Sequence, residues 1–203
     1  MAKKEVVVKK ERDVRIHASL WNVSGRLLQR GQDDEYLSFY QFMASIVFAA
    51  FTMEAYLNWL GQKTFPHWGY LERLSPKQKI ELISDQLKVP IDHGVRPWQT
   101  LKQLLDFRNE IAHGKPEILS AEAIEPVDEQ LDAKLGQKMK AGWERFVTRE
   151  NAERATKDIE KIVRILHSAS GGKDGIDPLS QGSASALATD DPRELDRLKR
   201  NKN

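Results

Sequence analysis

The sequence predicts an all-α protein, an up-and-down bundle of about five helices with a flexible tail at each end. Apolar residues recur at helical spacing in several segments of the 203-residue chain, and no segment shows a periodic β pattern. Hydrophobic residues make up 40% of the composition, enough for one sizeable core. We expect a basic polar tail over residues 1–12, a helical bundle over 13–169 and a disordered tail over 170–203.

Two helices are expected in the first third of the chain. Val14 to Leu28 carries apolar residues at the helical period, and Arg30 to Asp34 interrupts that pattern. Glu35 to Gln62 is apolar on nearly all sides, which is typical of the central helix of a bundle. Gly61 marks its expected end.

An aromatic-rich connector, Phe65 to Leu74, follows the central helix. The next helix begins with a capping signal, in which Ser75 is the N-cap, Pro76 occupies the first helical position and Gln78 the third. This pattern predicts a helix that runs to about Lys88.

Pro97 to Ala112 predicts a further helix, which we expect Gly114 to end by taking the left-handed conformation. The acidic segment from Glu117 to Gln137 is weakly patterned and is expected to be a loop with short helical pieces. Lys138 to Ser168 predicts a long charged helix that packs back on the bundle.

The segment from Gly171 to Asn203 is rich in Gly, Ser, Asp and Lys and has few large apolar residues. Such a composition buries too little surface to offset its ordering entropy, so we expect disorder, with room for a short helix after Pro192. Deleting the segment should therefore leave the melting temperature almost unchanged.

Composition excludes several kinds of site. The chain has no cysteine, which rules out disulfide frameworks, thiolate zinc sites and cysteine nucleophiles. Four of its histidines form no pair at ligand spacing, so we expect no metal and no cofactor; they are His17, His67, His93 and His167. The formal charge of +2 is nearly neutral, so any RNA site must be a local basic patch.

The expected location is the cytoplasm. The first residues lack the long apolar region of a secretory signal. The apolar run from Phe42 to Met53 is shorter than the roughly 20 residues needed to cross a bilayer and is followed by Glu54, so it predicts a core helix and no membrane association.

The segment Phe107 to Lys115 is the most informative about function. One face of its helix should carry an apolar stripe with Arg108 in its middle: Leu101, Leu104, Leu105, Arg108, Ile111 and Ala112. Asn109 and His113 lie on the other side, four residues apart. Because Arg108 and His113 are about 140° apart around the helix, either the last turn unwinds, or the arginine reaches around, or two copies meet across a two-fold axis.

Arg108, Asn109 and His113 at the end of such a helix resemble the Arg-x4-6-His motif of the HEPN superfamily, a group of small all-α domains. The resemblance covers about Glu35 to Lys115, with Lys138 to Ser168 as the final helix of the bundle. It implies a homodimer whose two motifs line one cleft. Many HEPN proteins are metal-independent endoribonucleases that act as toxins or antiviral effectors in phage infection or stress.

The resemblance implies a role for each motif residue. His113 would act as general base on an RNA 2′-hydroxyl or as acid toward the leaving oxygen. Arg108 would stabilise the negative charge of the transition state, and Asn109 would orient His113 or donate to a phosphate oxygen. Some toxin members that pair with a nucleotidyltransferase antitoxin have a tyrosine where this chain has Lys115, so regulation by tyrosine modification is in doubt here.

Each of these residues also has a simpler interpretation. Glu54 lies close to the apolar stripe of the central helix, and we expect it to pair with Arg108. The simpler interpretation is that both side chains reach solvent. His113 would only complement the negative end of the helix dipole, and Lys115 would be a solvated lysine instead of a phosphate contact.

The aromatic cluster in the connector also has two interpretations. It would either stack RNA bases or cap the core, and the second is favoured; its members are Phe65, His67, Trp68 and Tyr70.

Two functions follow from the sequence. The first is a homodimeric endoribonuclease that uses Arg108, Asn109 and His113, in a toxin–antitoxin, phage-defence or stress-response role, with an antitoxin or defence protein as a further partner. The second is a non-catalytic HEPN-like module that binds a nucleotide, RNA or a partner protein through the same polar cleft. The intact set of Arg108, Asn109 and His113 favours the first, and the lack of a broad basic surface in the composition favours the second.

Overall fold

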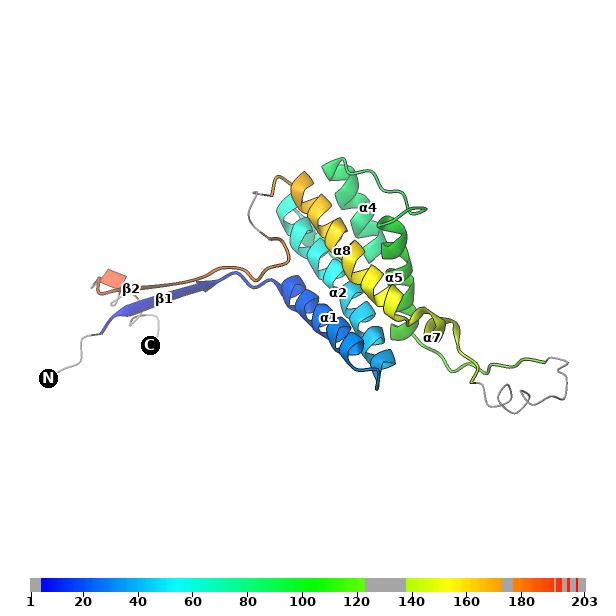
Figure 1. The fold of residues 1–203 in the computed structure, drawn as a ribbon. Coiled ribbons are helices and arrows are strands. Elements are labelled where there is room, and N and C mark those ends of the chain that lie inside the picture. Colours follow the sequence, from blue (N-terminus) through cyan, green and yellow to red (C-terminus); the bar gives the residue numbers. More distant parts are fainter. Residues whose placement is uncertain are drawn as a thin grey trace. The chain divides into compact units, whose positions relative to one another are not determined.

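A computed structural model describes residues 5–122, 138–172, 177–191, 193, 194, 197 and 200. The described chain is mostly helical, in agreement with the predicted all-α class, and has one small two-stranded sheet (Figure 1). It forms two compact units. The larger unit is a helical bundle over Ile16–Leu179, and the smaller one combines Met1–Arg15 with Ser180–Asn203.

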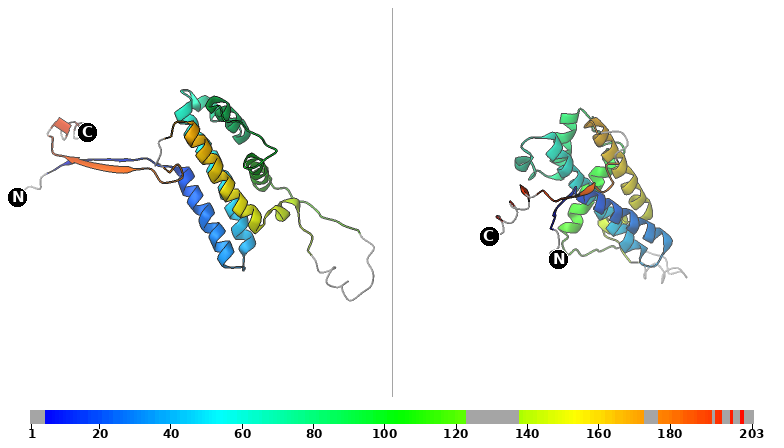
Figure 2. Two further views of the ribbon diagram at one scale, coloured as in Figure 1. Left: turned by 45° about the horizontal axis from the view of Figure 1, so that its top comes forward. Right: turned by 90° about the vertical axis from the view of Figure 1, so that its left-hand side faces the viewer.

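The bundle begins with an antiparallel helical hairpin (Figures 1 and 2). Helix α1 (Ile16–Asp33) packs along α2 (Ser38–Thr64), and the two are joined by a short turn. The helices approach closely where small residues meet: the Ser24 hydroxyl donates to the Ser45 carbonyl at 2.9 Å, and the Ser45 hydroxyl donates back to the Ser24 carbonyl at 3.0 Å. Both serines are buried, and each hydroxyl is satisfied by the other helix.

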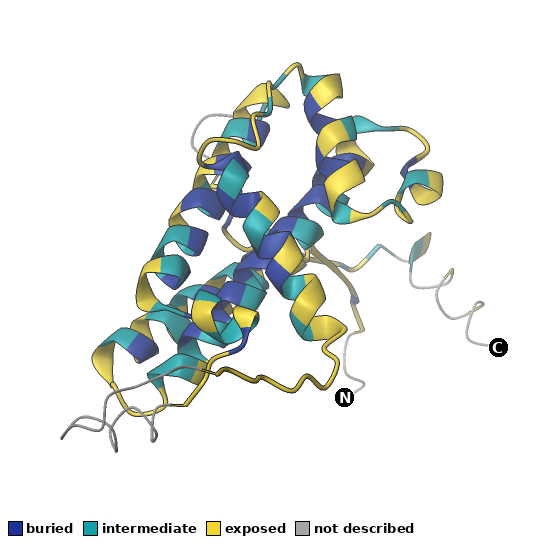
Figure 3. Cartoon of the chain, turned by 90° about the vertical axis from the view of Figure 1, so that its right-hand side faces the viewer, coloured by how far each residue is buried: buried dark blue, intermediate teal, exposed yellow. Residues whose placement is uncertain are grey.

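Helix α2 is the central helix of the bundle, as its apolar sequence predicts. It packs on α1 and on three later helices, α4 (Pro76–Leu87), α5 (Trp98–Ala112) and α8 (Arg149–Ala169). Its length and composition alone would suffice to cross a membrane, but half of the most apolar window is buried inside the protein. Buried residues lie on the inward faces of the helices and exposed residues on the outer faces (Figure 3). The largest fully buried side chains on α2 are Tyr56, Ile46, Met53, Leu57 and Leu60.

Gly61 does not end α2, contrary to the sequence prediction, because the helix continues to Thr64. Its role is steric: a methyl group at position 61 would lie only 2.4 Å from the indole ring of Trp68. Trp68 belongs to a short helix, α3 (Trp68–Leu71), that folds back on α2. Glycine therefore allows the connector to pack on the central helix.

Helix α4 (Pro76–Leu87) begins as the sequence predicts. The Ser75 side chain accepts a hydrogen bond from the Gln78 backbone N–H at 3.3 Å, and the Gln78 side chain accepts one from the Ser75 N–H at 3.0 Å. This reciprocal capping box is confirmed. The helix ends at Lys88, which has left-handed dihedral angles (φ 57°, ψ 35°).

The C-terminal part of the bundle differs from the predicted single helix over residues 138–168. Two helices form, α7 (Gly142–Phe146) and α8 (Arg149–Ala169), with a break at Val147 and Thr148. The Thr148 hydroxyl accepts from the Asn151 backbone N–H at 3.1 Å and so caps α8. The apolar pattern continues across the break, and for this reason the pattern alone did not reveal it.

A buried carboxylate joins α8 to the start of α5 (Trp98–Ala112). Asp158 on α8 is 4% exposed and accepts two hydrogen bonds from the Arg96 guanidinium, at 2.7 and 2.9 Å. The buried Thr100 hydroxyl donates to the same carboxylate at 2.6 Å. Burial alone would raise the pKa of Asp158, but the hydrogen bonds from Arg96 and Thr100, together with the nearby guanidinium charges, outweigh it and hold this pKa below its ordinary value.

The expectation that both ends of the chain lack regular structure is wrong in part. Strand β1 (Val7–Arg12) pairs antiparallel with β2 (Ala184–Thr189), from Val7 opposite Thr189 to Arg12 opposite Ala184. Five of the six residues in each strand are exposed, so no alternation of buried and exposed side chains marks the strands. Backbone pairing holds this ribbon together, and side-chain periodicity does not report such pairing.

Leu179 shows that the tail predicted to be disordered contributes to the core. Its side chain is 4% exposed and belongs to the main hydrophobic cluster. One residue earlier, the Pro178 carbonyl lies 3.0 Å from Nε2 of the buried His17. The bundle therefore extends beyond the predicted boundary at residue 169.

Truncation should locate this new boundary. A chain ending after Leu179 should melt close to the full-length protein. One ending after Ser170 should lose about 2 kcal/mol, because a buried leucine leaves the core. Its melting temperature should fall by about 4–8 °C, contrary to the expectation from composition that this deletion has almost no effect. Thermal melts followed by circular dichroism would measure both, with Leu179→Ala as the point-mutant control. Equal melting temperatures for the two truncations would contradict the role of Leu179.

Candidate active site at the end of helix α5

Helix α5 presents a buried face that differs in two places from the prediction. Leu101, Leu104 and Leu105 are buried as expected. Ala112 is exposed, whereas Phe107 is buried. The centre of the Phe107 ring lies 5.0 Å from the centre of the Phe146 ring of α7. The break before α8 places α7 against this side of α5, and the predicted straight helix contained no such contact.

The predicted pair between Arg108 and Glu54 is present. The Arg108 Nη2 atom donates to Glu54 Oε2 at 2.8 Å, and the side chains are 23% and 26% exposed. The pair joins α5 to the central helix α2. Such partly buried charges stabilise each other, and removing one would leave the other poorly compensated.

Asn109 is held by the same guanidinium. Arg108 Nη1 donates to the Asn109 side-chain oxygen at 2.8 Å, and the guanidinium carbon lies 5.5 Å from the centre of the Phe51 ring. The Arg108 Nε–H is buried and has no hydrogen-bond partner among the described residues. The guanidinium is thus fixed in direction by Glu54, Asn109 and Phe51.

His113 lies where α5 ends. Its dihedral angles (φ −117°, ψ 21°) are no longer helical, while its backbone N–H still donates to the Asn109 carbonyl at 3.0 Å. The helix therefore ends at His113 with its last turn still hydrogen-bonded, and the three alternatives for the angular gap to Arg108 stay predictions. Gly114 does not take the left-handed conformation predicted for it, since Gly171 is the one described glycine with positive φ.

The structure joins only part of the predicted site. Glu54, Arg108 and Asn109 are linked by hydrogen bonds. The side chains of His113 and Lys115 are exposed, and within the described part of the chain neither takes part in a hydrogen bond or ion pair that links it to this group. The arrangement offers a positioned guanidinium for anionic oxygen atoms and, a short distance along the chain, a solvent-accessible imidazole for proton transfer.

The contact of Arg108 with Phe51 was not part of the sequence prediction. A signal for it existed, because Phe51 and Glu54 are three residues apart on one helix and therefore share a face. Among the residues that the structure describes, no three or more His, Asp or Glu side chains form a group suited to a metal ion.

The aromatic cluster of the connector is divided between the two interpretations. Trp68 is 4% exposed, stacks on Phe65 at 5.9 Å between ring centres and belongs to the core, as the favoured interpretation requires. His67 and Tyr70 are exposed, Tyr70 to 87%. They line a cavity of about 540 Å³ together with Arg73.

Arg108→Ala should destabilise the fold more than His113→Ala, because it strands the partly buried Glu54 carboxylate. We expect a loss of about 1–2 kcal/mol for Arg108→Ala and almost none for His113→Ala. Lys77→Ala is the matched control, since the Lys77–Asp106 pair also joins two helices but is half exposed. Urea unfolding would measure all three, and equal stabilities of the Arg108 and His113 variants would remove the argument.

Comparison of the chain with protein-family models, with curated proteins and with solved structures gives no match in any of the three.

Proposed function

We propose that this protein is a HEPN-type, metal-independent endoribonuclease that cuts RNA by attack of the 2′-hydroxyl on the adjacent phosphate. The observation that carries the proposal is the guanidinium of Arg108, held by Glu54 and Asn109 at the end of α5 where the exposed His113 follows. A HEPN-like arrangement of the bundle is part of the same proposal, as is a role in the cytoplasm in toxin–antitoxin, phage-defence or stress-response systems.

In the proposed reaction His113 takes the proton of the 2′-hydroxyl or gives a proton to the departing 5′-oxygen. The exposed position of the His113 imidazole suits this role, because the ring must reach an RNA strand that binds from solvent. Arg108 donates two hydrogen bonds to the phosphate oxygens as negative charge increases. To do so the guanidinium exchanges its contact with Asn109 for the phosphate, while Glu54 keeps its orientation.

A homodimer would bring two such sites together. Next to Arg108, helix α2 carries apolar side chains that are only half buried, Val47, Phe48 and Phe51. The rings of Phe48 and Phe51 meet edge to face at 6.2 Å, and they form an apolar surface beside the motif. A second copy packed on this surface would cover it and place its own Arg108 and His113 nearby.

One observation favours the alternative, a non-catalytic HEPN-like module. Arg108 is already engaged by Glu54 and Asn109, and no hydrogen bond in the described residues joins it or Asn109 to the His113 imidazole. A nucleotide, an RNA or a partner protein would then bind the polar end of α5 without being cut.

Product chemistry separates the two functions. The purified full-length protein is incubated with RNA in EDTA, beside an otherwise identical RNA with one 2′-deoxy nucleotide at the cut site. We expect cleavage that leaves a 2′,3′-cyclic phosphate and a free 5′-hydroxyl, and no cleavage at the 2′-deoxy position. Sedimentation of the same sample should give a dimer at micromolar concentration.

Other products would change the conclusion. Products with a 5′-phosphate, or activity that EDTA abolishes, would show that the cleavage mechanism is wrong. RNA binding without cleavage would favour the module. A stable monomer would contradict the shared cleft.

A further inference from the structure

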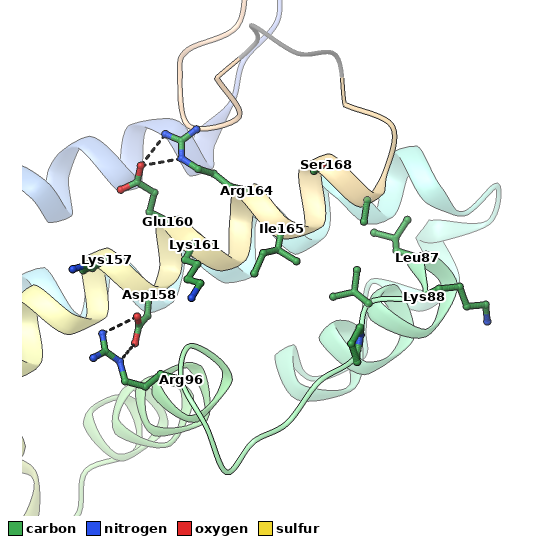
Figure 4. A pocket seen from close by; sticks show the side chains of 13 residues that line it. Leu87, Lys88, Arg96, Lys157, Asp158, Glu160, Lys161, Arg164, Ile165 and Ser168 are labelled. Carbon is green, nitrogen blue, oxygen red and sulfur yellow. Dashed lines mark hydrogen bonds and ion pairs between the residues drawn. The ribbon is translucent and has the colours of Figure 1, made fainter.

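A cavity of the bundle lies away from the α5 motif, in a groove between α8 and the end of α4 with the segment that follows it. We call it the α4–α8 groove; it has a volume of about 1060 Å³ (Figure 4). One wall is α8 from Lys157 to Ala169, and the other includes Leu87 to Pro90 and Arg96. Because the walls come from separate segments held in place by the fold, the groove is a feature of the folded bundle.

The lining of the groove is predominantly basic. Five basic side chains contribute to it, against the two acidic residues Asp158 and Glu160: Lys88, Arg96, Lys157, Lys161 and Arg164. Both acidic residues are already neutralised within the lining, since Asp158 accepts from Arg96 and Glu160 accepts from Arg164 at 2.8 and 3.0 Å. Positive charge therefore remains uncompensated in the groove.

Lys157 and Lys161 carry most of this remaining charge. Both are exposed, and neither forms an ion pair with any described residue. They lie four residues apart on α8, which is about 6 Å along the helix. Lys161 points from α8 into the space of the groove, whereas Lys88 points away from it (Figure 4).

The inner surface of the groove is apolar. Ile165 points into the space from α8, and Leu87 lies on the opposite side (Figure 4). Both are half buried, as is Val89. An occupant that used the whole groove would therefore need apolar groups for this surface and anionic groups for the two lysines.

We propose that the α4–α8 groove binds an acidic peptide segment of a partner protein. Leucine-like side chains of the segment would pack on Ile165 and Leu87, and two of its carboxylates would bind Lys157 and Lys161. Carboxylates four residues apart on a helix, or two apart on an extended chain, have the required separation of about 6–7 Å. This proposal is independent of RNA cleavage by Arg108 and His113.

A peptide fits the groove better than RNA does. Sites for single-stranded nucleic acid combine basic side chains with aromatic ones on which bases stack. None of the described residues that line the groove has an aromatic side chain. Its aliphatic surface instead suits the apolar side chains of a peptide.

Binding of designed peptides to the full-length protein tests the proposal. The probe is a short fluorescein-labelled peptide of Glu-Leu-Leu-Glu repeats, followed by fluorescence anisotropy at physiological salt. Peptides of Lys-Leu-Leu-Lys and Glu-Ser-Ser-Glu repeats test the sign of the charge and the need for apolar groups, and labelled oligouridylate tests RNA. We expect the first probe to bind at least about tenfold more tightly than the other three.

Variants then locate the site. Lys157→Glu/Lys161→Glu should weaken binding of the first probe at least about tenfold, and Ile165→Ser should weaken it without changing the charge. The matched control is Arg26→Glu/Arg30→Glu, which reverses two exposed cations four residues apart on α1. Binding should survive in this control. If Lys157→Glu/Lys161→Glu has a lower melting temperature than the unaltered protein, the milder variant Lys157→Gln/Lys161→Gln replaces it in the binding experiment.

Three results would overturn the proposal. The first probe fails to bind, or the α1 control weakens it as much as the groove variant does, which would indicate general charge attraction. Alternatively, oligouridylate binds more tightly than the peptide and loses affinity in the groove variant, which would make the groove an RNA site.

Discussion

His113→Ala should slow RNA cleavage at least about a hundredfold, because general acid–base catalysis by a side chain contributes roughly 10²–10⁴-fold to a rate. His113 is exposed and outside the helical core, so its removal should not change the fold. Single-turnover cleavage of a labelled RNA by equal amounts of folded protein measures the effect. The cut site and the products should stay the same for any residual activity.

The matched control is His93→Ala. His93 is a histidine with a partly exposed side chain, paired with Glu81 at 2.7 Å in the segment before α5, and it is not part of the motif. Its removal should leave the rate within about twofold, which corresponds to less than 0.5 kcal/mol. Full activity of the His113 variant would show that another group transfers the proton, and the binding-module interpretation of this motif would then be preferred.

Asp158→Ala should have the largest effect on stability of the changes considered for this chain. It removes the bonds to Arg96 and leaves the buried Thr100 hydroxyl without its acceptor. We expect a loss of about 3 kcal/mol in the free energy of unfolding, since a broken buried network leaves uncompensated polar groups. Asp106→Ala is the control, because the exposed Asp106–Lys77 pair should contribute less than about 1 kcal/mol.

This contribution of Asp158 should also depend on pH. The pKa of Asp158 in the fold lies below its ordinary value, so its stabilising effect is present above the unfolded-state pKa of about 3.9 and is lost as the pH falls through the folded pKa. The stability difference between the unaltered chain and Asp158→Asn should therefore be constant near neutral pH and narrow below about pH 4. Urea unfolding over this range measures it, and a difference that widens in acid would show that the carboxylate is not held as described.

Local signals in the sequence predicted those parts of the fold that local interactions determine. The capping box at Ser75 and the apolar length of α2 involve residues close in the chain, and both appear as predicted. The pair between Glu54 and Arg108 was predictable for another reason: each charge lies on or near an apolar face and needs a partner.

Features that depend on distant segments were missed. Leu179 is a single apolar residue in a polar tail, and nothing nearby indicates that it reaches the core. Glycine is common at helix ends, but Gly61 lies within α2, where its lack of a side chain makes room for the Trp68 ring. The break before α8 was missed for a different reason: Thr148 is a local N-cap signal, but the apolar period continues across it.

The pairing of β1 with β2 has a consequence for the order of events during synthesis. The two strands come from opposite ends of the chain, with Val7 opposite Thr189. The ribosome makes β1 before the bundle helices and β2 after them, so all these helices are complete before β1 can find its partner. Until then the Val6–Val8 run is an unpaired edge, open to pairing with another nascent chain. A chain that stopped before β2 would leave β1 unpaired permanently, and the charges of Lys9, Lys10 and Arg12 would then be its protection against pairing with other chains.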